Sequence, residues 1–142
     1  MADIVLLIED LPDEQVRAKR ALEACGFKVA VTASLAGALR IWEGLGTALK
    51  GVITDLHFPE RADDSDASKP CGLAIVADAA RFGVPVVVCS SINHHYADYL
   101  KIVVEVLASA HPLQSIPFVM DRKDWERAAH DLQDLIAKKE VS

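Results

Sequence analysis

The sequence predicts an α/β fold in which five parallel strands form one sheet that helices cover on both faces. Short runs rich in Val, Ile and Leu alternate along the chain with longer segments in which apolar residues recur at helical spacing. The short runs are apolar almost throughout, which is typical of strands buried on both faces of a parallel sheet. The alternation occurs five times, and it therefore predicts a doubly wound (βα)5 arrangement with right-handed crossovers.

The first two βα units are marked by residues that start and stop helices. Residues 3–8 (DIVLLI) form the first predicted strand, Pro12 lies at or near the start of the first helix, and Gly26 closes that helix. Residues 27–33 form the second predicted strand, and Ser34 is the expected N-cap of the second helix. The expected inner face of the second helix comprises Leu35, Ala38, Leu39, Trp42 and Leu45.

The other three units follow the same alternation. The third strand is expected at residues 49–55, the fourth within 83–90 and the fifth at 116–121, with helices near 72–81, 94–110 and about 122–139. The last helix has a regular apolar face, so we expect the following side chains to be buried: Trp125, Ala128, Ala129, Leu132, Leu135 and Ile136.

Composition excludes several classes of protein. A chain of 142 residues suits a single domain, which we expect to span residues 1–142, and no apolar stretch is long enough for a membrane span. The formal charge of -6 argues against direct nucleic-acid binding, because such binding depends on Lys and Arg neutralising phosphates. Three widely spaced cysteines and the lack of a secretory signal indicate free thiols in the cytoplasm.

Carboxylates follow two of the predicted strands. Glu9 and Asp10 follow the first strand, Asp55 ends the third, and Ser90 ends the fourth. Because the carboxyl ends of parallel strands meet at one edge of the sheet, we expect these side chains to converge there. Clustered like charges require a cation or raised pKa values, and oxygen ligands favour Mg²⁺, with Mn²⁺ as the other candidate.

Three segments carry a family resemblance. VLLIEDLPDEQ, GVITDLHFPE and PVVVCSS resemble the acidic-pair, phosphoacceptor and hydroxyl motifs of the receiver domains of two-component response regulators. The order of the motifs, the interval from Asp10 to Asp55 and the placement at strand ends also agree with that family. The resemblance covers almost the whole chain and implies a flavodoxin-like, CheY-like fold for a stand-alone receiver.

The resemblance implies a role for each residue at the strand ends. Asp55 would be the phosphoacceptor that attacks a phosphohistidine or a small phosphodonor, in a signalling domain rather than an enzyme with a turnover substrate. Glu9, Asp10, Asp55 and the backbone carbonyl of His57 would hold Mg²⁺. The Ser90 hydroxyl would hydrogen-bond the phosphoryl group and report its presence.

The chain departs from the family at the end of the fifth strand, where members carry a lysine followed by a proline. If Phe118 is the aromatic switch residue, then Asp121 stands in the lysine position, where it would serve as N-cap of the last helix. If Lys123 is the phosphoryl partner, the aromatic position moves to Met120. Arg122 could also supply the positive charge, or the site could have no fixed cation.

A second departure is the segment 59–71, which separates the third strand from its helix by more residues than the family usually has. Its Asp and Ser content indicates a flexible, solvated insertion. The segment is either a flap beside Asp55 that screens phosphodonors or kinases, or a surface insertion without a role.

The resemblance also implies partners. A sensor histidine kinase or a histidine phosphotransfer protein would supply the phosphoryl group, and a separate protein effector would contact the fourth helix, fifth strand and fifth helix. The same surface is also a candidate interface for a homodimer. The alternative function is an atypical receiver that binds its partner independently of phosphorylation.

Three other classes fit less well. A flavodoxin-like electron carrier needs a phosphate-cradling loop after the first strand, where EDLPDE would repel the phosphate. A phosphohydrolase of the aspartyl-phosphate type needs an acid two residues after the nucleophile, and this chain has His57 there. A hydrolase built on Cys89 lacks an identifiable base, and a cysteine in an apolar strand is usually inert.

Overall fold

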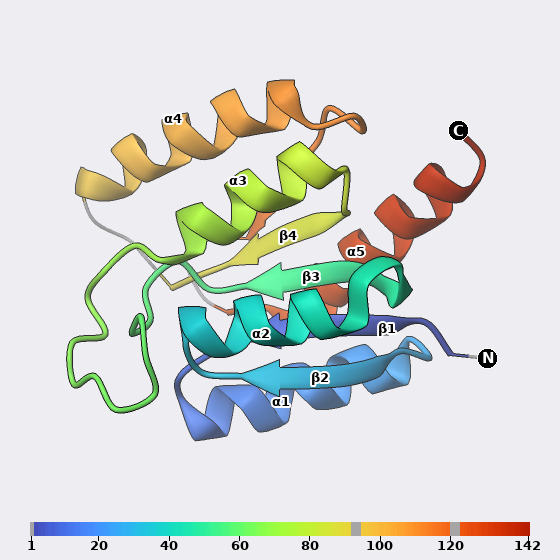
Figure 1. Ribbon diagram of the computed structural model, residues 1–142. Helices are drawn as coiled ribbons and strands as arrows, with labels where there is room; N and C mark the ends of the chain where they lie inside the picture. Colours follow the sequence, from blue (N-terminus) through green and yellow to red (C-terminus); the bar gives the residue numbers. More distant parts are fainter. Residues whose placement is uncertain (1, 92–94, 120–122) are drawn as a thin grey trace.

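One five-stranded parallel sheet carries helices on both faces, as the sequence predicts (Figure 1). The computed structural model describes residues 2–91, 95–119 and 123–142. The strands are β1 (Ile4–Ile8), β2 (Lys28–Thr32), β3 (Leu49–Thr54), β4 (Val86–Cys89) and β5 (Phe118–Val119). The helices are α1 (Pro12–Ala24), α2 (Leu35–Leu45), the short 3₁₀ turn η1 (Gly46–Ala48), α3 (Gly72–Phe82), α4 (His95–Ala110) and α5 (Trp125–Glu140).

The strand order β2-β1-β3-β4-β5 places the first and third strands side by side at the centre of the sheet. Leu6 of β1 pairs with Ala30 of β2 on one side and with Val52 of β3 on the other. The order reverses between β1 and β3, and open parallel sheets bind ligands beyond the carboxyl ends of the strands at such a point. The two strands that precede the predicted carboxylates are therefore neighbours.

Alternate residues of the strands build two separate cores. On one face Val5, Leu7 and Ile53 pack against α1 and α5. On the other face Leu6 and Val52 pack against the side of the sheet that α2, α3 and α4 cover. Both faces of the strands are buried, which explains why the strand sequences are apolar throughout rather than alternating.

Most predicted helix features are confirmed. Ser34 is the N-cap of α2, where its hydroxyl accepts a hydrogen bond of 3.1 Å from the Gly37 N–H. The prediction that Leu39 belongs to the inner face of α2 is wrong, because the side chain is 42% exposed. Every predicted inner residue of α5 is buried: Trp125, Ala128, Ala129, Leu132, Leu135 and Ile136.

The start of α5 differs from the prediction. The helix begins at Trp125 rather than near 122, and Asp124 is its N-cap, with the side chain accepting a 3.1 Å hydrogen bond from the Arg127 N–H. The capping role predicted for Asp121 is therefore wrong, and Asp121 itself lies outside the described residues. The displaced start leaves Lys123 in the segment that leads from β5 into α5.

The two ends of the predicted insertion are joined by backbone contacts. Phe58 is fully buried, forms a parallel bridge with Pro70, and donates its N–H to the Lys69 carbonyl over 3.4 Å. The carbonyls of Pro59 and Glu60 accept hydrogen bonds of 3.0 and 2.8 Å from the first two N–H groups of α2. Both ends of the insertion are thus fixed to the fold beside β3.

No helix in the described part of the chain is long and apolar enough to cross a membrane.

Candidate functional site

Three strand ends present polar residues at one edge of the sheet. Glu9 follows β1, Asp55 follows β3 and Ser90 follows β4. The backbone N–H of each residue donates a hydrogen bond of 3.0 to 3.1 Å to a carbonyl of the neighbouring strand. The sheet ladder therefore continues one residue beyond the strand ends and fixes the side chains that start there.

The predicted carboxylates converge. Glu9, Asp10 and Asp55 each contribute an oxygen to a group in which these atoms lie within 4.8 Å of one another. Glu9 is fully buried, Asp55 is buried and Asp10 is half-buried. Three carboxylates this close repel strongly, so positive charge is required between them.

Lys123 supplies one positive charge. Its Nζ donates a 2.8 Å hydrogen bond to Asp55 Oδ2 and a second hydrogen bond to Glu9 Oε1. The side chain is 6% exposed, and both ion pairs are buried. Of the two basic residues that could pair with Asp55, the described structure thus brings Lys123 to the acidic cluster, while Arg122 lies outside the described residues.

The electrostatics of the cluster follow from burial and from these contacts. Burial raises the pKa of Glu9 to about 7, since the lost hydration outweighs the hydrogen bond from Lys123, and the negative charge of Asp55 adds to the rise. Burial alone would lower the pKa of Lys123, but the carboxylates of Asp55 and Glu9 raise it. The lysine is therefore held in its charged form, while the cluster keeps an excess of negative charge.

The remaining carboxylate oxygens accept backbone hydrogen bonds. Glu9 Oε2 accepts from the Asp10 N–H at 2.8 Å, and Asp55 Oδ1 accepts from the Leu56 N–H at 2.7 Å. The Gln15 side chain donates to the Glu9 carbonyl at 2.6 Å and ties α1 to the end of β1. These bonds fix the orientation of both buried carboxylates.

Gly72 allows α3 to start against the backbone of Asp55 and Leu56. Its N–H donates to the Leu56 carbonyl at 2.9 Å, and a Cβ at this position would lie 2.2 Å from the Asp55 carbonyl oxygen and 2.7 Å from Leu56 Cα. Both contacts are with backbone atoms, and the Asp55 N–H is hydrogen-bonded to the Ile8 carbonyl of β1. The sequence placed residue 72 only at the start of the predicted helix near 72–81, so the importance of Gly72 to Asp55 becomes visible only in the fold.

Replacing Gly72 with Ala is expected to lower the free energy of unfolding by about 3 kcal/mol, since the added methyl group must displace backbone atoms. Urea denaturation of the two proteins measures the difference. Gly44→Ala is the matched control, because Gly44 lies in α2 with nothing within 4 Å of its Cβ position. That control should be neutral or stabilising by helix propensity. An equal response of both variants would disprove the close approach.

Contacts at the start of α5 position Lys123. The Trp125 indole N–H donates a 2.6 Å hydrogen bond to Glu14 Oε2 of α1, and Asp124 caps the helix. Together they fix the two residues that follow Lys123. This chain has no Lys-Pro pair after β5. The Trp125–Glu14 contact and the Asp124 cap hold the start of α5 in position.

The cluster has the ligands that Mg²⁺ prefers. The donors are hard carboxylate oxygens on converging strand ends, and three carboxylates face a single ammonium group in the described cluster. A divalent cation at Glu9, Asp10 and Asp55 would balance the remaining negative charge. The residues present therefore fit the metal that the sequence suggests.

The other predicted site residues lie around the cluster. Ser90 is 1% exposed at the end of β4, next to the strand that carries Asp55. His57 is half-buried two residues after Asp55. Burial lowers its pKa, and this effect exceeds the rise that the negative charge of Asp55 causes. Phe118 is half-buried in β5 and packs against the core on the α2–α4 side.

The contact of Lys123 bears on the choice of switch residue. With Lys123 as the phosphoryl partner, the spacing of the family assigns the aromatic position to Met120, which lies outside the described residues. The switching role of Phe118 stays a prediction, and this contact does not favour it.

The buried thiol of Cys89 is unsuited to catalysis. It is fully buried in β4, and burial raises its pKa far above the ordinary range of thiols, with the charge of Asp55 adding to the rise. Cys25, Cys71 and Cys89 are all free thiols.

Comparison with known proteins identifies the fold. No family model matches the chain, and no curated protein sequence matches it. Among solved structures, the chain is similar to a response regulator receiver domain protein from Clostridium thermocellum, with a TM-score of 0.74 and 18% identity over 99% of this chain and 98% of that one.

Two further structures show the same similarity. The receiver domain of a signal transduction histidine kinase from Syntrophus aciditrophicus has a TM-score of 0.72 and 15% identity, covering 99% of this chain and 95% of that one. A response regulator receiver protein from Sinorhizobium medicae has a TM-score of 0.68 and 19% identity, covering 96% and 95%. The chain has the receiver-domain fold, and the predicted flavodoxin-like, CheY-like architecture is confirmed.

Proposed function

We propose that the protein is a phosphoacceptor receiver of a two-component phosphorelay, in which Mg²⁺-dependent phosphorylation of Asp55 switches a protein-binding surface. The observation that carries the proposal is the 2.8 Å contact of the Lys123 ammonium group with Asp55, within a buried cluster that also holds Glu9 and Asp10. The receiver-domain fold supports a signalling role for this arrangement.

In the reaction, a carboxylate oxygen of Asp55 attacks the phosphorus atom of the donor. An oxygen–phosphorus bond forms, and the bond from phosphorus to the histidine nitrogen, or to the leaving oxygen of a small phosphodonor, breaks with its electron pair on the leaving group. Mg²⁺ held by Glu9, Asp10, Asp55 and the backbone carbonyl of His57 would, when bound, neutralise charge on the phosphoryl group.

Lys123 and Ser90 have complementary roles in the product. Lys123 pairs with Asp55 before the reaction and, on its long side chain, can follow a phosphoryl oxygen afterwards. The Ser90 hydroxyl donates a hydrogen bond to a phosphoryl oxygen, which draws the end of β4 toward Asp55. This movement biases the two states of the surface that α4, β5 and α5 form.

The surface of α4 suits a protein effector. Tyr99, Ile102 and Val106 are 62%, 60% and 65% exposed and, at spacings of three and four residues, share one side of the helix. Exposed apolar side chains of this kind mark surfaces that bind other proteins. A histidine kinase or histidine phosphotransfer protein is the proposed donor, and a separate protein is the proposed effector.

Hydrogen–deuterium exchange tests the switch. Addition of beryllium fluoride, which stands in for the phosphoryl group, with Mg²⁺ is expected to change amide protection in peptides from α4, and Asp55→Asn should remove the change. Unchanged exchange in the wild-type protein, with beryllium fluoride bound, would contradict the switch. That result would favour a receiver that binds its partner independently of phosphorylation.

A further inference from the structure

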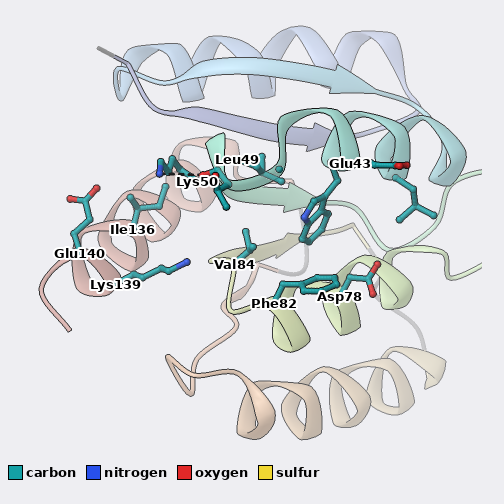
Figure 2. A pocket seen from close by; sticks show the side chains of 13 residues that line it. Glu43, Leu49, Lys50, Asp78, Phe82, Val84, Ile136, Lys139 and Glu140 are labelled. Carbon is teal, nitrogen blue, oxygen red and sulfur yellow. Dashed lines mark hydrogen bonds between the residues drawn. The ribbon is translucent and has the colours of Figure 1, made fainter.

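An apolar groove lies at the opposite edge of the sheet from the acidic cluster, between α2, α3 and α5 (Figure 2). Its volume is about 800 Å³, and its apolar lining comprises Leu39, Trp42, Leu49, Phe82, Val84 and Ile136. Leu49 begins β3, whereas Asp55 follows the other end of that strand, so the groove and the acidic cluster are separate sites.

Two aromatic rings form a contact surface in this groove. Phe82 is 58% exposed, and its ring meets the Trp42 ring edge to face, with centroids 6.4 Å apart. Leu39 adds a second exposed apolar side chain. The Arg81 guanidinium lies 4.5 Å from the Phe82 ring centroid and supports that ring. The apolar body of a ligand would remove these surfaces from water.

The charges around the groove are unequally distributed. Figure 2 shows the Lys139 side chain pointing into the groove toward Val84, while Glu140 points away from it. Lys50 lies near the same end, and its ammonium group donates to the Thr47 carbonyl at 3.3 Å. Within the described residues neither lysine takes part in an ion pair.

The other end of the groove is acidic. Glu43 and Asp78 lie there, away from Lys139 (Figure 2). The Asp78 carboxylate is engaged by Arg81 at 3.1 Å. A molecule with an apolar body and one anionic end therefore has a single favourable orientation, with its anion at Lys50 and Lys139.

We propose that this groove binds a small amphipathic carboxylate, with the apolar body against Trp42 and Phe82 and the carboxylate between Lys50 and Lys139. The volume falls in the range of small-molecule sites. A second copy of the chain is the main alternative occupant, and the sedimentation experiment below tests it. The site lies away from Asp55, so binding is independent of the phosphorylation chemistry proposed above.

The two tryptophans of the chain allow a direct test. We would titrate ¹⁵N-labelled full-length protein with 4-phenylbutyrate and follow the indole N–H resonances, using Trp42→Phe to assign them. The Trp42 resonance should shift saturably, whereas Trp125, buried against α1, should not. Asp55→Asn should bind with the same affinity. Absence of a Trp42 shift at millimolar ligand would overturn the proposal.

Variants separate the charge from the apolar surface. Lys50→Gln with Lys139→Gln should weaken 4-phenylbutyrate about fivefold to tenfold, without affecting the neutral 4-phenylbutyramide, and Lys19→Gln on α1 is the charge control. Phe82→Ser should weaken both compounds, by about tenfold, whereas Val106→Ser on α4 should change neither. If the affinity for 4-phenylbutyrate does not change in the double lysine variant or in Phe82→Ser, the proposed binding site is wrong.

Sedimentation velocity on the same samples identifies the main rival. The proposal expects a sedimentation coefficient that does not depend on groove variants. Concentration-dependent self-association that Phe82→Ser abolishes, with no binding of 4-phenylbutyrate, would make the groove an interface between copies and overturn the proposal.

Discussion

Asp55→Asn is expected to abolish the phosphoryl adduct that the wild-type protein forms with acetyl phosphate and Mg²⁺. An amide has no anionic oxygen with which to attack phosphorus, and the buried carboxylate beside it is held by other contacts. Glu9 is engaged by Lys123 and by the Asp10 N–H. Intact-protein mass spectrometry measures the adduct, with a metal-free sample as the second negative control.

Asp63→Asn is the matched control for that experiment, since Asp63 is an exposed residue of the insertion. It should form the same adduct as the wild-type protein. Circular dichroism should show Asp55→Asn folded, because Lys123 still neutralises Glu9 in that variant. An adduct of undiminished yield on Asp55→Asn would place the acceptor at another residue.

Lys123→Met is expected to lower the free energy of unfolding by about 3 kcal/mol in the absence of metal. The substitution removes the ammonium group and leaves the carboxylates of Glu9 and Asp55 buried and close together. Added Mg²⁺ should recover part of the loss, because its charge replaces that of the lysine. The yield of phosphoryl adduct should also fall, by at least about tenfold, with the loss of a charged hydrogen bond to the reacting group.

Lys69→Met tests the importance of burial. Lys69 forms an ion pair of 3.0 Å with Glu60, but both side chains are about half exposed, so this variant should lose much less stability than Lys123→Met. Urea denaturation at several Mg²⁺ concentrations compares the two variants. Equal losses, or a Lys123→Met protein whose stability does not respond to Mg²⁺, would contradict the electrostatic account of the cluster.

The sequence predicted the fold well because local signals agree with it. The apolar runs locate the strands, Ser34 marks the start of α2, and the spacing from Trp125 to Ile136 defines the buried side of α5. The convergence of Glu9, Asp10 and Asp55 follows from the parallel topology alone, since their strands are neighbours in the sheet.

The partner of Asp55 could not be chosen from the sequence. Lys123 precedes the helix because α5 begins only at Trp125, and this start depends on the Asp124 cap and on the contact of Trp125 with Glu14. Family spacing counted from Phe118 put Asp121 in that place. Only the tertiary contacts distinguish the two registers.

Contacts between segments that are distant in the sequence could not be predicted either. The close approach of Gly72 to Asp55 depends on how the insertion closes at Phe58 and Pro70. Leu39 has the spacing of an inner residue of α2, but it lies beyond the edge of the core and lines the groove. Helical periodicity predicts which side of a helix faces the core, while the neighbouring elements determine how much of that side is buried.

The most direct test of the central claim, that Asp55 carries the phosphoryl group, is to map the modified residue in the wild-type protein. After incubation with acetyl phosphate and Mg²⁺, borohydride reduces an aspartyl phosphate to homoserine, which peptide mass spectrometry can locate. We predict homoserine at position 55, dependent on Mg²⁺. Homoserine at another position, or none at position 55 in a sample whose intact mass shows the adduct, would contradict the account.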